Sequence, residues 1–182
     1  MSRRRRTRLE SHVFLVGFMG VGKTRLGRLV SRRVRARFLD LDHDVEAAAG
    51  MPISRLFQTF GQTYFRELEH VCLRRTRESP PSVIATGGGA FTFERNINFI
   101  KNLGFSLWID VDFDSIVGRM SERGRAARPL LHDEERARAL FTARRNFYRR
   151  ADLVVEATPG EAADSVAAKI LGLLREKHCV TS

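Results

Sequence analysis

A glycine-rich loop between an apolar run and an amphipathic stretch constrains this chain more than any other feature. Residues 17–24 read GFMGVGKT and satisfy the pattern G-x-x-x-x-G-K-S/T. The run 13–16 is apolar without alternation, which is typical of a strand buried on both faces, and Leu26, Leu29 and Val30 recur at helical spacing after the loop. Strand, loop and helix in this order predict backbone N–H groups that surround phosphate oxygens at a helix N-terminus.

The side chains of this loop have separate expected roles at a bound nucleotide. Lys23 is expected to reach the β- and γ-phosphates, and the Thr24 hydroxyl is expected to bind Mg²⁺. The sequence therefore predicts ATP and Mg²⁺ as ligands. The residues of the loop expected to contact the nucleotide are Gly20, Val21, Gly22, Lys23, Thr24 and Arg25.

Four further apolar runs predict strands that alternate with helices. The strands are expected over 38–41, 83–86, 105–111 and 153–155, and the helices over 62–77, 113–120, 134–149 and 161–174. This alternation predicts an α/β domain with a mainly parallel sheet. Such sheets bind ligands at the carboxyl ends of their strands, so the residues that directly follow the strands are the first candidates for a site.

Two aspartates with one residue between them follow the strand expected over 38–41. In extended chain Asp40 and Asp42 point to the same side, because side-chain direction alternates with a period of two. One carboxylate could hold the magnesium shell while the other receives or orients the proton of an attacking hydroxyl. The alternative is that Asp42 only caps a helix that begins near His43.

Arg66 and Glu69 lie three residues apart in the helix expected over 62–77, so they share one face. They form either an ordinary surface pair or an arrangement in which Glu69 orients the planar Arg66 guanidinium to grip a substrate carboxylate. A triple glycine at 87–89 directly follows the strand expected over 83–86. Residues without Cβ let a ligand approach the backbone and expose N–H donors.

Two arginine-rich segments contribute to the net charge of +11. The first, 1–11, is expected to be a disordered basic arm, with contact to RNA or to a membrane as the alternative. The second, 121–134, is expected to be a mobile cationic loop, with an ordinary solvated connection as the alternative. A positive surface favours anionic partners but does not choose among phosphates, carboxylates and nucleic acid.

Composition and cysteine count bound the class of protein. The 182 residues, 43% of them hydrophobic, fit one compact domain. No stretch approaches the ~20 apolar residues of a membrane span, and no cleavage site follows the short apolar run after the arginine arm, so a secretory signal is rejected. Cys72 and Cys179 lie far apart and near no other cysteine or clustered histidine, which predicts neither a zinc site nor a disulfide and suits the cytoplasm.

Together these motifs resemble the shikimate kinase family over about 12–174. The matching pieces are GFMGVGKT at 17–24, FLDLD at 38–42, FRELE at 65–69, TGGGA at 86–90, RPLL at 128–131 and RRNFY at 144–148. The glycine loop alone is shared with many nucleotide-binding proteins, whereas the order and spacing of the other pieces are much more specific. The resemblance implies a P-loop NTPase-type three-layer sandwich with a five-stranded parallel sheet, in a single kinase domain over 12–176.

The resemblance also implies a reaction: transfer of the ATP γ-phosphoryl group to the 3-hydroxyl of shikimate, a step of chorismate and aromatic amino-acid biosynthesis. The acceptor would lie in a substrate-binding region near 42–70. Asp42 would bind its hydroxyls and act near the transferred proton, Asp40 would hold Mg²⁺ through water, and Lys23 would act in catalysis. The residues implied for the rest of the acceptor pocket are Arg66, Arg144, Gly87, Gly88 and Gly89.

The cationic loop over 121–134 resembles the family's mobile lid over ATP. Arg128 would place positive charge on the migrating phosphoryl group, and Arg123 is preferred over Arg119 and Arg125 as the residue that packs on adenine. The chain departs from the family at Arg25, where a second hydroxyl residue is usual, and at Asn146, where proline is frequent. The expected partner is the small-molecule substrate alone, with the protein a monomer that binds neither membrane nor nucleic acid.

Two rival interpretations stay open. Another sugar acid such as gluconate could be the acceptor on the same scaffold, because a fold does not determine function. A protein of another class, a nucleotide sensor or RNA-binding protein, could keep the glycine loop without chemistry, and the arginine arm is the feature that favours it.

Overall fold

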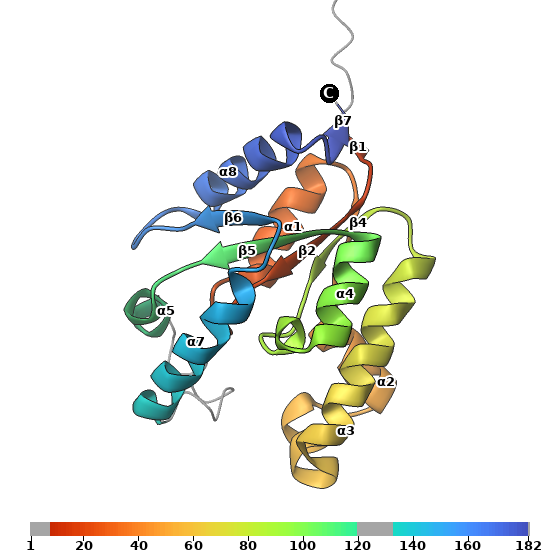
Figure 1. Ribbon diagram of the computed structural model, residues 1–182, viewed down its shortest axis with the longest axis vertical. Coiled ribbons are helices and arrows are strands. Elements are labelled where there is room, and N and C mark those ends of the chain that lie inside the picture. Colours follow the sequence, from red (N-terminus) through yellow and green to blue (C-terminus); the bar gives the residue numbers. More distant parts are fainter. Residues whose placement is uncertain (1–7, 120–132, 182) are drawn as a thin grey trace, which may run out of the picture.

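A computed structural model describes residues 8–119 and 133–181 of the chain and shows a central parallel sheet with helices on both sides (Figure 1). The strands follow the order β3-β4-β2-β5-β6, and all neighbours pair parallel. They are β2 (His12–Val16), β3 (Arg37–Asp40), β4 (Ser82–Ala85), β5 (Gly104–Asp110) and β6 (Leu153–Glu156). Each boundary lies within one residue of its prediction, so the predicted five-stranded sheet is confirmed.

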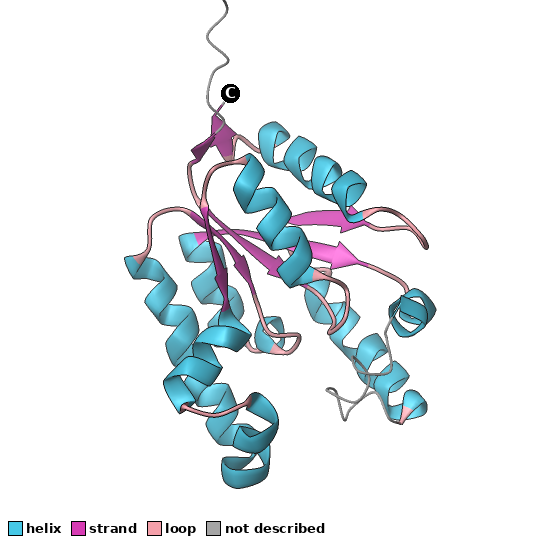
Figure 2. Cartoon of the chain, turned by 180° about the vertical axis from the view of Figure 1, so that it is seen from behind, coloured by secondary structure: helices cyan, strands magenta, loops and turns pink. Residues whose placement is uncertain are grey.

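Helices cover both faces of this sheet, which confirms the three-layer arrangement. Figures 1 and 2, seen from opposite sides, show α1 and α8 against one face and α4 and α7 against the other. The described helices are α1 (Lys23–Arg33), α2 (Leu41–Ala49), α3 (Ile53–Arg75), α4 (Glu94–Leu103), α5 (Phe113–Arg119), α7 (Glu134–Tyr148) and α8 (Ala163–Glu176), with single turns η1 (Thr76–Glu78) and η2 (Ala90–Thr92).

The burial of residues along the strands explains why the hydrophobic pattern of the sequence predicted them. The central strand β2 is buried at every position, as a strand covered on both faces must be. The edge strand β6 alternates instead, with Leu153 and Val155 buried while Val154 is 41% exposed. A run without alternation therefore marked the centre of the sheet, next to the loop that carries the chemistry.

The structure adds α4, which the sequence patterns did not predict, begins α2 at Leu41 rather than near His43, and lengthens α3. Only three residues of α4 are buried, which leaves a stripe too short for a clear helical period. The helix α3 begins at Ile53 rather than near 62, and Gly61 interrupts it with φ 78° and ψ 177°. The glycine breaks the periodicity, so only the part after it was recognised.

The domain extends beyond the predicted limits of 12 and 176. The short strand β1 (Arg8–Leu9) pairs antiparallel with β7 (Val180–Thr181), and Leu9 is buried. The prediction of disorder for 1–11 is therefore wrong for residues 8–11, because two-residue strands carry no periodic signal. Residues 1–7 and the segment 120–132, which holds most of the predicted lid, lie outside the described residues.

None of the helices in the described part of the chain has the length and apolar character that a bilayer crossing requires.

Candidate active site

The nucleotide loop joins the carboxyl end of β2 to the start of α1, and two of its glycines are required for different reasons. Gly22, the N-cap of α1, has φ 94°, and no atom lies within 4 Å of a methyl group built there, so only the backbone conformation demands glycine. Gly17 has φ 140°, and a methyl group there would lie 2.9 Å from the Ile109 carbonyl oxygen. The first N–H groups of α1 are thus presented at a compact turn, as phosphate binding requires.

Lys23 and Thr24 occupy the first turn of α1, at the inner side of this loop. Lys23 Nζ donates to the carbonyl oxygens of Gly17 and Phe18, both at 2.8 Å, so its charge lies over the loop. The Thr24 hydroxyl donates to Asp40 Oδ2 at 2.7 Å. A hydroxyl and a carboxylate in contact beside a phosphate cradle are suitable ligands for Mg²⁺, which prefers oxygen and keeps part of its water shell.

Asp40 ends β3 and caps α2, since its side chain accepts a hydrogen bond from the Asp42 backbone N–H. The alternative in which Asp42 is the cap is therefore wrong, and so is the expectation that both aspartates sit in extended chain: α2 begins at Leu41. A short strand followed at once by a helix leaves no periodic signal at this junction. Asp42 instead projects from the first turn of α2.

Asp42 is accessible to solvent but has protein around most of its carboxyl group. This partial desolvation raises the pKa of the Asp42 carboxyl, and the positive charge of Lys23 opposes the rise. Asp42 therefore combines access for a ligand with an increased affinity for a proton.

Arg66 and Glu69 form a buried ion pair. Arg66 Nη1 donates to Glu69 Oε2 at 2.6 Å, and the side chains are 12% and 1% exposed. This excludes the alternative of an ordinary surface pair. Burial is the main cause that raises the pKa of the Glu69 carboxyl, with the Arg66 charge acting against it. Among the described residues, Glu69 Oε1 and Arg66 Nε are buried and have no hydrogen-bond partner, which is unusual for buried polar atoms.

The triple glycine after β4 is the point at which the predicted acceptor residues meet. A methyl group at Gly87 would lie 2.9 Å from Asp42 Oδ1, and one at Gly89 would lie 2.8 Å from Arg66 Cζ. At Gly88 it would lie 3.6 Å from Arg144 Nη1. Side chains from α2, α3 and α7 therefore converge on one backbone segment, and a side chain at Gly87 or Gly89 would displace its neighbours from α2 or α3.

The same segment also touches the nucleotide loop. A methyl group at Gly88 would lie 3.1 Å from the backbone nitrogen of Met19, which belongs to the loop. Burial lowers the pKa of the nearby Arg144 guanidinium, as expected for a cation partly removed from water. The two halves of the predicted site, phosphate cradle and acceptor pocket, are thus direct neighbours.

One site residue was missed by the sequence patterns, and others cannot be located. Tyr148 lies in the RRNFY motif, yet nothing in the sequence indicated that its hydroxyl donates to the Gly88 carbonyl. The predicted lid residues Arg123 and Arg128 lie outside the described residues.

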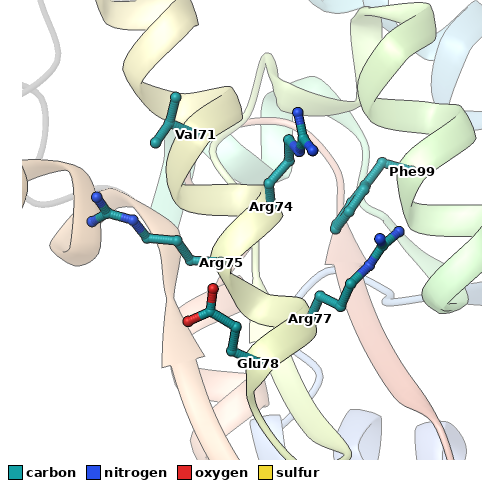
Figure 3. A pocket seen from close by; sticks show the side chains of 6 residues that line it. All are labelled: Val71, Arg74, Arg75, Arg77, Glu78 and Phe99. Carbon is teal, nitrogen blue, oxygen red and sulfur yellow. The ribbon is translucent and has the colours of Figure 1, made fainter.

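A separate hollow of about 320 Å³ lies at the end of α3 and contains none of the predicted site residues (Figure 3). Its walls are formed by Val71, Arg74, Arg75, Arg77, Glu78 and Phe99. Figure 3 shows Arg74 and Arg77 on the side of Phe99, and the Arg77 guanidinium lies 5.3 Å from the centre of that ring. Because η1 precedes the amino end of β4, the hollow lies away from the carboxyl ends where the site is built.

A glycine cradle that leads into Lys-Thr at a helix start, with an aspartate and two arginines beside it, defines the class of P-loop small-molecule kinases. Comparison with known proteins narrows the class. The family profile described as shikimate kinase matches residues 19–175, and the chain belongs to the shikimate kinase family.

Individual similar proteins support this family assignment. The chain is 41% identical over 156 residues to a shikimate kinase of Cereibacter sphaeroides, covering 84% of this chain and 77% of the relative. A solved structure described as shikimate kinase from Acinetobacter baumannii in complex with shikimate superposes with a TM-score of 0.85 at 33% identity, covering 92% and 94% of the two chains. A gluconokinase from Sinorhizobium meliloti, at 12% identity and a TM-score of 0.55 over 93% and 98% of the chains, shares the fold alone.

Proposed function

We propose that this protein transfers the γ-phosphoryl group of ATP to the 3-hydroxyl of shikimate, giving shikimate 3-phosphate and ADP. The observation that carries the proposal is the meeting of Asp42, Arg66 and Arg144 around the triple glycine, beside Met19 of the nucleotide loop. The similarity to the A. baumannii kinase crystallised with shikimate supports the choice of acceptor.

Arg66 and Arg144 hold the shikimate carboxylate. A planar guanidinium forms two parallel hydrogen bonds with a carboxylate, and Glu69 keeps that of Arg66 in one orientation. Arg144 is partly desolvated, so an anionic ligand compensates for the water that this cation has lost. The carboxylate anchors one end of the ring and leaves a hydroxyl at the other end for Asp42.

Asp42 accepts the proton of the attacking hydroxyl. As the hydroxyl oxygen bonds to the γ-phosphorus, its proton passes to the Asp42 carboxylate, the bond to the β-phosphate oxygen breaks, and ADP leaves with that electron pair. The raised pKa of Asp42 favours the proton transfer, because a base is most effective when its pKa approaches the working pH. Lys23 lies close enough to Asp42 for its positive charge to favour the ionised carboxylate. The same ammonium group stabilises the outer phosphates.

Thr24 and Asp40 would hold Mg²⁺, Asp40 through water, and the direct contact between their side chains supports this assignment. When bound, the ion would neutralise negative charge on the outer phosphates. The remaining residues that we assign to the nucleotide site are Gly20, Val21, Gly22 and Arg25. Arg128 and Arg123, which lie outside the described residues, are assigned by family resemblance to the migrating phosphoryl group and to adenine.

One copy of the chain brings the nucleotide loop and the acceptor residues together. We propose that the protein acts as a monomer. The two cysteines are free and buried, which agrees with a reducing cytoplasm.

Measurement of ATP consumption with and without shikimate tests the proposal. A coupled ADP assay should show turnover that depends on shikimate, and phosphorus NMR of the product should show a phosphate ester on the 3-hydroxyl. Turnover with gluconate but not shikimate would favour the rival kinase. Binding of ATP without turnover on any hydroxy acid would favour the nucleotide sensor.

A further inference from the structure

The hydroxyl of Tyr148 joins two parts of the acceptor pocket. Tyr148 is the last residue of α7, its side chain is 1% exposed, and its hydroxyl donates to the Gly88 carbonyl. The Arg144 side chain, one turn earlier on the helix, lies close enough to the same hydroxyl for its charge to counter the effect of burial on the pKa of Tyr148. One hydroxyl therefore connects the glycine segment after β4 with an arginine of the pocket.

The bond to Gly88 determines the direction of a backbone donor. The peptide between Gly88 and Gly89 is trans, so its N–H points opposite to the carbonyl that Tyr148 holds. Among the hydrogen bonds of the described residues, none engages the N–H groups of Gly88 and Gly89. Because neighbouring glycines resist rotation only weakly, a peptide between them needs an external anchor to present its N–H to a ligand.

The position of α7 does not depend on this hydroxyl alone. Arg145 donates to Asp110 Oδ2 at 2.6 Å and ties the helix to the end of β5, and the Tyr148 ring lies 6.1 Å from that of Trp108. Burial raises the pKa of Tyr148 to about 12, so the hydroxyl keeps its proton and is not a proton acceptor at neutral pH. Loss of the oxygen should disturb orientation within the pocket and leave the helix in place.

We propose that Tyr148 is a positioning residue for the acceptor: its hydroxyl holds the Arg144 guanidinium and the Gly88–Gly89 peptide in the orientation that the substrate carboxylate and hydroxyls require. This inference rests on the proposed function, since it assumes that shikimate occupies this pocket.

The substitution Tyr148→Phe removes the oxygen and keeps the ring. The KM for shikimate should rise about tenfold, as expected for one lost hydrogen bond to a charged group, while the KM for ATP stays within about twofold. The control is Thr76→Val, which removes another buried, hydrogen-bonded hydroxyl at the opposite end of β4 and should leave both KM values unchanged. An unchanged shikimate KM in Tyr148→Phe would overturn the inference.

A double-mutant cycle separates positioning from general stability. In an Arg144→Ala background, Tyr148→Phe should raise the shikimate KM by less than about threefold, because part of its effect passes through Arg144. A full tenfold rise in both backgrounds would contradict the coupling. The wild-type protein is assayed first: without shikimate turnover the proposed function itself fails, whereas turnover with an unaffected Tyr148→Phe variant rejects only the role of Tyr148.

Discussion

The nucleotide loop and the acceptor pocket lie side by side but are built in opposite ways. The loop is one contiguous segment, 17–24, in which backbone groups and one lysine face the ligand. The pocket draws charged side chains from α2, α3 and α7 around the triple glycine. The comparison teaches that separate sets of groups bind ATP and the acceptor. A substitution in the nucleotide loop should therefore leave acceptor binding intact, and a substitution in the acceptor pocket should leave ATP binding intact. Asp42 and Lys23 act where the sets meet.

The largest effect is expected at that junction. Asp42→Asn removes the proton acceptor and should lower kcat by roughly 10²- to 10⁴-fold. The Kd for ATP, measured by calorimetry, should change by less than about twofold because the nucleotide loop is untouched. A kcat within tenfold of the wild type would mean that Asp42 is not the base.

On the loop side, Lys23→Ala should lower kcat by roughly 10²- to 10³-fold, the usual cost of losing one donor to developing charge. Shikimate binding, followed by calorimetry without nucleotide, should be unaffected. A matching loss of shikimate affinity would show that the two sets are not separable.

On the pocket side, Arg66→Ala should weaken shikimate binding by about 1.5–3 kcal/mol, or about 10- to 150-fold. The ATP Kd serves as the internal control. Circular dichroism checks folding, since the substitution leaves Glu69 buried without its partner. Unchanged shikimate affinity in the folded variant would place the carboxylate elsewhere.

The smallest effect concerns stability as a function of pH. Burial raises the pKa of Glu69 above its ordinary 4.5, so the folded state holds this proton more tightly than the unfolded state. Ionisation of Glu69 therefore costs stability as the pH rises above 4.5. In urea unfolding without ligand, the free energy of unfolding of Glu69→Gln, measured relative to that of the wild type, should increase as the pH rises above 4.5.

A matched control lies two residues away on the same helix. Glu67 is exposed, and its hydrogen bonds with Arg95 lower its pKa, so Glu67→Gln should show a trend of opposite sign. Parallel pH trends for the two variants would contradict the assignment of Glu69 as the desolvated group.

More of the nucleotide loop than of the acceptor pocket could be predicted from the sequence. The loop could be recognised because its glycines, lysine and threonine are neighbours in the chain and lie between a fully apolar strand and an amphipathic helix. Asp42 and Arg66 could be singled out from their local spacing, and Arg144 could be named from family resemblance. That they converge depends on the packing of α2, α3 and α7, which no local pattern encodes.

Other features left no pattern to read. The change from strand to helix at Asp40 and Leu41 occurs within one peptide unit, so extended chain was predicted for residues that begin a helix. The bond from Tyr148 to Gly88 joins groups 60 residues apart. The pairing of β1 with β7 involves four residues at opposite ends of the chain, too few for any periodic signal.

The central claim is that an acceptor hydroxyl lies between Asp42 and the phosphates held by the nucleotide loop. A crystal structure with Mg²⁺, shikimate and a non-hydrolysable ATP analogue tests it directly. The account predicts the carboxylate on Arg66 and Arg144, with the 3-hydroxyl within hydrogen-bonding distance of Asp42 and facing the γ-phosphate. Shikimate bound in another cavity, or with its 3-hydroxyl turned away from Asp42, would contradict it.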